Sequence, residues 1–466
     1  MKLKIIILIS FFSLYLAAQK EDYIWYFGCN FSNFSTPTAG LDFNSGVPVP
    51  LLNSVMPCTE GCATQSDRNG NLLFYTNGTT VWDRTHSIMM NGLAVGGHTS
   101  AEQSAQIIPF PNDTTKFYVF CQDGYPTCPG TGLHYSIIDM TLNGGLGGIT
   151  APKAILLQKG TCEWLSACKH INGTDYWVVT SDYDSTRFYS YQVSSLGISS
   201  PIITNFPYIT SSNFKLDFNT KGDQIVFKAT SQPTPTVVYN VRYLADFNQS
   251  NGVVSNFITL DSLGNNDGTA FSPNDSLLYA FSYVPTLTNT VLYQYNVKSP
   301  NIFQNKNIIG YFSGGPHIGM KLGPDKKIYC SSGSPDSLDI IHFPNIVGTG
   351  CNFQTKALYL GGRKIRFMLP NYSFPLAKYP LTINQTIVNN IVSLFPNPNL
   401  NSFSVKSATR ILSYSIQDLS GKELLYEVFK KSSKDFEIKH NLEKGIYIIS
   451  FEDYLGKKCF EKFVVN

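Results

Sequence analysis

The sequence predicts an all-β protein, with a β-propeller of about seven blades at residues 19–384 and a small C-terminal β-sandwich at residues 385–466. In the first segment, short runs rich in β-branched and aromatic residues alternate with Gly, Pro, Asn and Asp turns, and helical periodicity is almost absent. A strand–turn–strand pattern recurs there at intervals of roughly 40 to 60 residues, as in a repeat fold. Charged residues become about twice as frequent after Asn384, which places the domain boundary there.

The recurring pattern predicts individual blades. Each copy consists of two strands joined by a tight turn in which Pro, Asn, Asp or Gly supplies the geometry. Three clear copies and three looser ones occur: Ala63–Tyr75, Thr269–Tyr279, Gly319–Tyr329, Leu216–Val226, Ser104–Phe120 and Ala167–Val179. Trp25–Gly28 at the start and Phe367–Pro370 at the end supply one further blade. We therefore expect the first strand to complete the last blade, which hides both sheet edges.

The N-terminus has the features of a signal peptide, predicted at residues 1–18. Two lysines precede an apolar run from Ile5 to about Ala17, and small residues stand just before Gln19. The run is too short to cross a bilayer, and no later stretch is long and apolar enough to do so. We therefore expect an exported mature protein without a transmembrane segment.

The charge balance excludes some partners. The chain has 35 basic and 32 acidic residues, for a net charge of +3. Nucleic acids and anionic membrane surfaces attract proteins with concentrated positive charge, so neither is expected as a main partner. The sequence predicts no cofactor and no metal: zinc-type Cys and His spacing is absent, and the acidic loop at Asp246–Gly252 has its glycine one position late for a calcium loop.

Ten cysteines in an exported chain favour disulfide bonds, because the compartment is oxidising. Close spacing predicts two local bonds, and a third pair is suited to a longer loop. The candidate pairs are Cys121 with Cys128, Cys162 with Cys168, and Cys330 with Cys351. The sequence leaves the pairing of Cys29, Cys58, Cys62 and Cys459 open.

Motifs at the N-terminal end give a resemblance to known proteins. They are Trp25–Gly28, Ala39–Phe43, Gly61–Thr64 and Asn77–Trp82. With them the chain resembles, over roughly residues 23 to 380, a large group of secreted bacterial propellers, with blades like those of WD or YVTN repeats. The resemblance implies a propeller and export, but no shared reaction.

The C-terminal segment carries five short blocks in a fixed order. They are Pro-Asn-Pro, an Asp-x-x-Gly-Lys hairpin, a Gly-x-Tyr strand start, a Gly-Lys turn and a terminal Lys-x-Val strand. The predicted signal residues are Pro396, Asn397, Pro398, Asp418, Gly421, Lys422, Gly445, Tyr447, Lys462 and Val464. The tail resembles a type A sorting domain of type IX secretion. This implies recognition by the type IX machinery at the outer membrane, removal of the tail, and release or attachment at the cell surface.

Two functions remain open for the propeller. No zincin, nucleophile-elbow or P-loop motif occurs, so we expect a non-enzymatic binding or adhesion protein for a glycan, polymer or protein. The alternative is an extracellular polysaccharide hydrolase or lyase that uses carboxylates in the central channel. Candidate side chains are Asp42, Glu60, Glu102, Glu163, Asp217 and Asp267, and His317 is a further residue that opens a blade.

Overall fold

A computed structural model gives the structure of the chain. It describes residues 20–28, 38–58, 60–124, 132–161, 163–182, 186–207, 210–234, 237–261, 268–284, 289–313, 319–331, 335–365, 367–371, 392–418, 423–453 and 458–466. The chain forms two compact units, Met1–Ala377 and Lys378–Asn466. The predicted signal peptide, and the predicted boundary at residue 384, lie outside the described residues.

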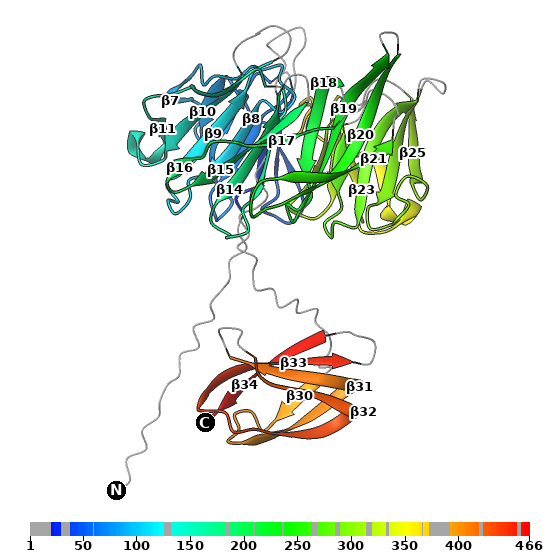
Figure 1. Cartoon of the computed structure of the whole chain (residues 1–466). Coiled ribbons are helices and arrows are strands. Elements are labelled where there is room, and N and C mark those ends of the chain that lie inside the picture. The colour runs from blue at the N-terminus through cyan, green and yellow to red at the C-terminus, as the bar shows by residue number, and fades with distance from the viewer. Residues whose placement is uncertain are drawn as a thin grey trace. The chain divides into compact units, whose positions relative to one another are not determined.

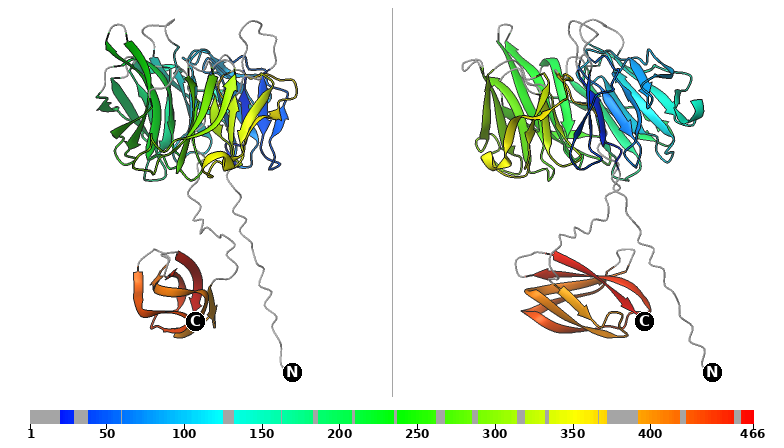
Figure 2. Two further views of the ribbon diagram at one scale, coloured as in Figure 1. Left: turned by 90° about the vertical axis from the view of Figure 1, so that its right-hand side faces the viewer. Right: turned by 180° about the vertical axis from the view of Figure 1, so that it is seen from behind.

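The first unit is a ring of seven blades of mainly antiparallel strands, of which blades 2 and 3 are joined into one nine-stranded sheet; it is coloured from blue to yellow in Figure 1 and seen from two further sides in Figure 2. This confirms the predicted fold class. The first three blades consist of these strands in chain order: blade 1, β1 (Ile24–Phe27), β2 (Ala39–Asp42) and β3 (Val49–Leu51); blade 2, β4 (Ala63–Ser66), β5 (Leu72–Thr76), β6 (Thr80–Asp83) and β7 (Ile88–Leu93); blade 3, β8 (Ala105–Pro109), β9 (Lys116–Gln122), β10 (Gly132–Asp139) and β12 (Ile155–Lys159). The next two are blade 4, with β13 (Ser166–Lys169), β14 (Tyr176–Ser181), β15 (Arg187–Ser194) and β17 (Ile202–Asn205), and blade 5, with β18 (Thr210–Phe218), β19 (Gln224–Thr234), β20 (Val237–Phe247) and β21 (Val254–Asp261). The last two are blade 6, with β22 (Thr269–Phe271), β23 (Leu277–Val284), β24 (Asn289–Asn296) and β25 (Asn307–Ser313), and blade 7, with β26 (Met320–Leu322), β27 (Ile328–Ser331), β28 (Ser337–Ile341) and β29 (Phe353–Tyr359). Two short strands, β11 (Gly148–Ile149) and β16 (Gly197–Ile198), add to blades 3 and 4.

The six repeat copies identified in the sequence are the first hairpins of blades 2 to 7. The turn between β4 and β5 shows why the sequence forms them. The Asp67 carboxylate accepts the N–H groups of Asn69 and Asn71, at 2.8 and 2.9 Å, and Gly70 takes the positive φ of 86° that the turn requires. Local turn chemistry therefore fixes where each blade begins.

The innermost strands form the wall of the ring. Each of β4, β8, β13, β18 and β22 contacts the first strand of the next blade. The segment Phe367–Asn371 completes blade 1, because Ser331 Oγ donates to the Phe367 carbonyl on one side and the Asn371 N–H donates to the Cys62 carbonyl, at 2.7 Å, on the other. The two ends of the propeller therefore share one blade, as predicted, and neither leaves an open edge.

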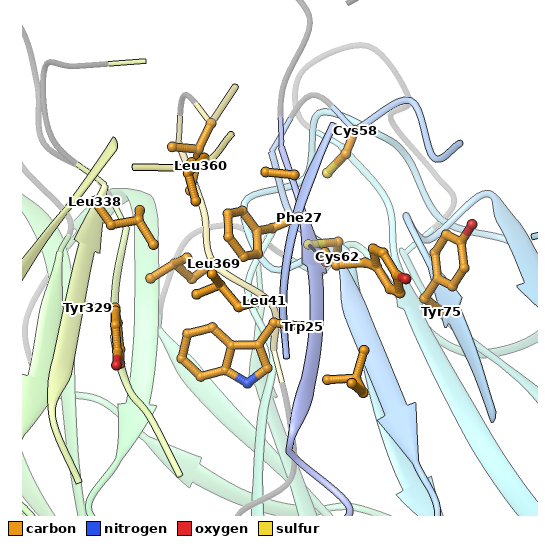
Figure 3. Close-up of a cluster of buried hydrophobic side chains, with 14 of the residues drawn as sticks. Trp25, Phe27, Leu41, Cys58, Cys62, Tyr75, Tyr329, Leu338, Leu360 and Leu369 are labelled. Atoms are coloured by element: carbon orange, nitrogen blue, oxygen red, sulfur yellow. Dashed lines mark hydrogen bonds between the residues drawn. The ribbon is translucent and has the colours of Figure 1, made fainter. Parts of the chain in front are cut away.

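A large aromatic core holds this shared blade against its neighbours (Figure 3). The Trp25 ring lies 4.9 Å from the Phe43 ring and 5.7 Å, edge to face, from Tyr329 of blade 7. Leu360 and Leu369, from the far end of the unit, are buried in the same cluster. Such aromatic pairs stabilise by about 0.5–1.5 kcal/mol each beyond the area they bury, so closure relies on packing as well as on strand pairing.

The second unit is a five-stranded β domain with a core of its own. Its strands are β30 (Val392–Phe395), β31 (Ser402–Gln417), β32 (Glu423–Lys439), β33 (Gly445–Asp453) and β34 (Lys458–Val465). Among the described residues of this unit, β31 and β32 are the longest strands, at 16 and 17 residues. Register shifts along β31 let its first part pair with β30 and its last part pair with β33.

The described cysteines are not joined by any disulfide bond. The predicted bond between Cys330 and Cys351 is therefore not formed in the structure, although both side chains are buried in one cluster. Burial raises the pKa of the Cys351 thiol, and the Tyr279 hydroxyl opposes this shift. Cys121 and Cys168 are buried thiols, and their predicted partners Cys128 and Cys162 lie outside the described residues. No helix in the described part of the chain is long and apolar enough to span a membrane.

Candidate functional site

Three of the predicted carboxylates lie at the same end of the ring. Glu60 belongs to the connection between β3 and β4, Glu102 to that between β7 and β8, and Glu163 to that between β12 and β13. In a four-stranded antiparallel blade, the connections to the next blade all lie opposite the first hairpin turns. The three glutamates therefore stand on neighbouring blades at the end away from those turns, and we call them the acidic rim.

Backbone hydrogen bonds join the connections that carry the acidic rim. The Glu60 N–H donates to the Thr99 carbonyl and the Gly61 N–H donates to the Ala101 carbonyl, both at 3.1 Å. The Gln103 N–H donates to the Glu163 carbonyl, also at 3.1 Å. Each connection thus holds the next one, and the carboxylates are carried on a fixed frame rather than on independent loops.

Glu60 is the electrostatically unusual member of the rim. Burial and, second to it, the nearby negative charge of Glu163 raise the pKa of its carboxyl to about 7, while a hydrogen bond from Ser100 opposes the shift. Two carboxylates that repel each other in a partly desolvated site do not both ionise readily. Near neutral pH the rim therefore contains a glutamate that exchanges between its neutral and charged forms.

Gln103 links opposite sides of the ring at its centre. Its side chain is buried, and its amide donates to the Leu216 carbonyl on β18 at 3.0 Å and to Asn371 Oδ1 at 3.3 Å. The side-chain oxygen of Gln103, Oε1, accepts the Leu216 N–H at 3.1 Å. The Gln103 side chain thus pairs with the backbone N–H and carbonyl of Leu216 in blade 5. It also contacts Asn371, in the segment that completes blade 1.

Two small cavities lie along the described parts of the inner strands. A cavity of about 20 Å³ lies between β18, β22 and β26, and one of about 10 Å³ lies beside Glu102, Gln103 and Lys321. A single water needs roughly 10–15 Å³, whereas sites for organic ligands usually measure about 300–1,000 Å³. Neither cavity is large enough for a sugar ring, so a ligand would have to meet the rim from outside.

The other predicted site residues are not brought together. Asp42 accepts the Asn44 N–H at 2.7 Å in a local turn, and Asp217 accepts the Thr269 hydroxyl at 2.7 Å beside the larger cavity. Asp246 accepts a hydrogen bond from Asn256 at 2.8 Å, on the same strand pair. Asp267 and His317 lie outside the described residues. The residues that the structure describes contain no group of three or more potential metal ligands.

In the second unit the first and last predicted signal blocks meet. Asn397 donates from its side-chain amide to the Lys462 carbonyl and accepts the Val464 N–H, both at 2.9 Å. Pro396 and Pro398, on either side of it, have no N–H to compete for these partners. The Asn397 side chain thus holds the Pro-Asn-Pro segment against β34 through one donated and one accepted backbone hydrogen bond, as a neighbouring strand would.

Asn399 extends this contact. Its N–H donates to the Val464 carbonyl at 2.9 Å, its carbonyl accepts the Asn466 N–H at 2.9 Å, and its Oδ1 lies 2.7 Å from Nε2 of the buried His440. It pairs with Val465 as a short parallel bridge. Neither Asn399 nor His440 was predicted from the sequence as a signal residue.

The remaining signal residues lie in the same sheet or beyond the described part. Gly445 begins β33 opposite Val465, and the Tyr447 ring stacks on Phe463 with the ring centres 5.6 Å apart. Asp418 follows the end of β31. Gly421 and Lys422 lie outside the described residues.

Comparison with known families identifies the second unit. Residues 393–466 match the family model of the secretion system C-terminal sorting domain. No curated protein sequence matches the chain.

Solved structures of other proteins show a distant likeness to the chain. A hydrazine synthase of Kuenenia stuttgartiensis shares 13% identity over 67% of this chain and 93% of its own, with a TM-score of 0.40. A putative 6-phosphogluconolactonase of Bacteroides uniformis shares 13% identity over 69% and 92%, with a TM-score of 0.43. A second putative 6-phosphogluconolactonase, from Bacteroides fragilis, shares 11% identity over 75% and 97%, with a TM-score of 0.34. At this identity the likeness concerns the fold alone.

Proposed function

We propose that this secreted or cell-surface propeller, which carries a type IX sorting domain at residues 393–466, is a binding protein whose acidic rim recognises an extracellular polysaccharide. The supporting observation is the rim itself: three glutamates on three successive connections, fixed by backbone hydrogen bonds at one end of the ring. Ionised carboxylates accept hydrogen bonds and donate none, so they suit the hydroxyl or amino groups of a neutral or amino-containing glycan. An anionic polymer would be repelled.

The size of the inner cavities favours binding over catalysis. Glycosidases enclose the scissile bond between two carboxyl groups that stand about 5–10 Å apart in a concave pocket. The two cavities along the inner strands, at about 20 and 10 Å³, are too small for this. A rigid ring that presents side chains on its connections is instead a common arrangement for recognition.

One observation supports the alternative, a glycan hydrolase. A glutamate whose pKa is raised to about 7 beside a second carboxylate has the character of a general acid paired with a base or nucleophile. In that case protonated Glu60 would give its proton to the leaving oxygen, and Glu163 would act on the opposite side of the sugar. The two functions make opposite predictions for pH.

The test is to screen the purified mature chain on a neutral and amino-glycan array and to measure the affinity of the best ligand against pH. If ionised Glu60 accepts a hydrogen bond from the glycan, affinity rises as pH increases through about 7, where the carboxyl loses its proton. A Glu60→Gln, Glu163→Gln double variant should bind on the order of 10- to 100-fold more weakly and lose this pH dependence. Asp223→Asn, at an exposed carboxylate on the turn between β18 and β19 and outside the rim, is the matched control.

The same samples distinguish the alternative. Release of shorter sugars from the glycan, with a rate that falls as pH rises above about 7 and is abolished in Glu60→Gln, would establish the hydrolase instead. Binding that is unchanged in the double variant would place the ligand elsewhere on the ring and refute the role of the acidic rim.

A further inference from the structure

Two buried thiols flank the acidic rim. Cys58 and Cys62 lie on the connection between β3 and β4, on either side of Glu60 and Gly61, and are 2% and 0% exposed. Both belong to the aromatic core of the shared blade and are labelled in Figure 3. The sequence left their pairing open, because a separation of three residues by itself fits several backbone shapes.

The Cys58 side chain lies against the backbone that directly precedes Cys62. The Cys58 thiol lies 3.3 Å from the Glu60 carbonyl oxygen and 3.4 Å from that of Gly61, so its sulfur sits over the peptide that leads directly into Cys62. The Cys62 thiol lies 3.3 Å from the Tyr26 carbonyl oxygen on β1. The two thiols also interact with each other: the Cys62 thiol is the largest cause of the raised pKa of Cys58, ahead of burial.

Gly61 has no room for a larger residue between them. A Cβ at that position would stand 2.3 Å from the Ser104 nitrogen and 2.7 Å from the Glu102 carbonyl oxygen. The connection is therefore pressed against its neighbour at Gly61, directly before Cys62. A disulfide bond requires such proximity of two side chains on a backbone that does not have to move.

We infer that Cys58 and Cys62 form a disulfide bond in the exported protein, and that this bond staples the connection that carries Glu60. The bond forms by thiol–disulfide exchange with the disulfide of an oxidoreductase in the exported compartment. The S–S bond of the oxidant breaks and takes up two electrons and two protons, and the two thiols lose the same two electrons and two protons as their S–S bond forms. The thiols are buried in the finished ring, so the exchange belongs to folding, before the shared blade closes.

The direct test is mass mapping of the mature protein, exported and purified without reductant and alkylated before digestion. We expect the peptide that contains Cys58 and Cys62 to be unalkylated, lighter by two hydrogens, and alkylated at both sites only after reduction. Alkylation of both thiols without reductant, or a bond from Cys62 to another cysteine such as Cys29, would overturn the inference.

A second measurement separates a covalent staple from simple packing. Reductant should lower the Tm of the wild-type protein by on the order of 2–5 °C more than it lowers that of a Cys58→Ala, Cys62→Ala double variant. Cys330→Ala, at another fully buried thiol that forms no disulfide bond in the structure, is the matched control and should keep the full reductant effect. Equal reductant effects in wild type and double variant would show that the two residues are only packed thiols. The mapping result does not depend on the identity of the ligand, so failure of the proposed function leaves it intact.

Discussion

A chain that ends at Ala377 should fold normally and yet fail to leave the periplasm. The two units have separate cores, since every member of the buried cluster in the second unit comes from residues 392–465. The ring is completed by its own segments, with Asn371 bound to the Cys62 carbonyl, so the second unit is not needed to cover a sheet edge. Removal of the sorting domain should therefore abolish export and leave propeller stability unchanged.

The measurement is cell fractionation together with thermal unfolding of the truncated and full-length chains. We expect the truncated protein in the periplasm, with a cooperative transition at the same Tm as the first unit of the full-length chain. A variant with Asn397→Ala alone is the matched control within the sorting domain, because it removes two hydrogen bonds to β34 and keeps both prolines. Normal amounts of truncated protein outside the cell would contradict the sorting assignment, and a truncated chain that does not fold would show that the second unit is structural.

The largest loss of stability is expected for Asp261→Ala. Asp261 and Arg242 are 3% and 2% exposed, and the guanidinium donates to the carboxylate at 2.7 Å. Arg242 also donates to the Phe281 carbonyl and to the Ser282 hydroxyl, while the Tyr295 hydroxyl donates to Asp261. The pair thus connects blade 5 to blade 6. Loss of the carboxylate leaves a buried cation uncompensated, which should cost about 3–5 kcal/mol of unfolding free energy.

Chemical denaturation of the variant checks this value. Asp113→Ala is the control, since its ion pair with Lys116 is partly exposed and such pairs contribute about 1 kcal/mol or less. Replacement of both partners, as in Arg242→Met with Asp261→Leu, should recover much of the loss, because an apolar pair leaves no isolated charge in the core. A single variant as stable as wild type would mean that water reaches the pair and that it does not join the blades.

The blades were predictable because their boundaries are local. Each first hairpin contains its own Asp, Asn, Pro or Gly turn, as at Asp67–Gly70, and such turns are visible in a few consecutive residues. The sharing of blade 1 also followed from the sequence. Outside the six complete repeat copies, one strand motif remained at the start of the segment and one at its end, and together they supply a further blade. The sorting domain was predictable because its blocks follow a fixed order.

Contacts between distant residues were not predictable in the same way. Gln103 binds Leu216 and Asn371, which stand 113 and 268 positions away, and nothing in the surrounding sequence distinguishes it from other buried glutamines. The way β31 pairs first with β30 and then with β33 was not predictable either, because it depends on register shifts between distant strands. The acidic rim was only partly foreseen: Glu60, Glu102 and Glu163 were candidates, but Asp42 belongs to a local turn, and only the ring brings the three glutamates to one end.

The central claim is that the chain consists of a self-contained ring and a detachable sorting domain. The most direct measurement is peptide mapping by mass spectrometry of the protein recovered outside the cell and of that in the periplasm. Peptides from residues 20–371 should occur in both fractions, and peptides from residues 392–466 should occur only in the periplasm. Recovery of both sets in equal amounts from the extracellular protein would contradict removal of the tail, and absence of the chain from the extracellular fraction would contradict export itself.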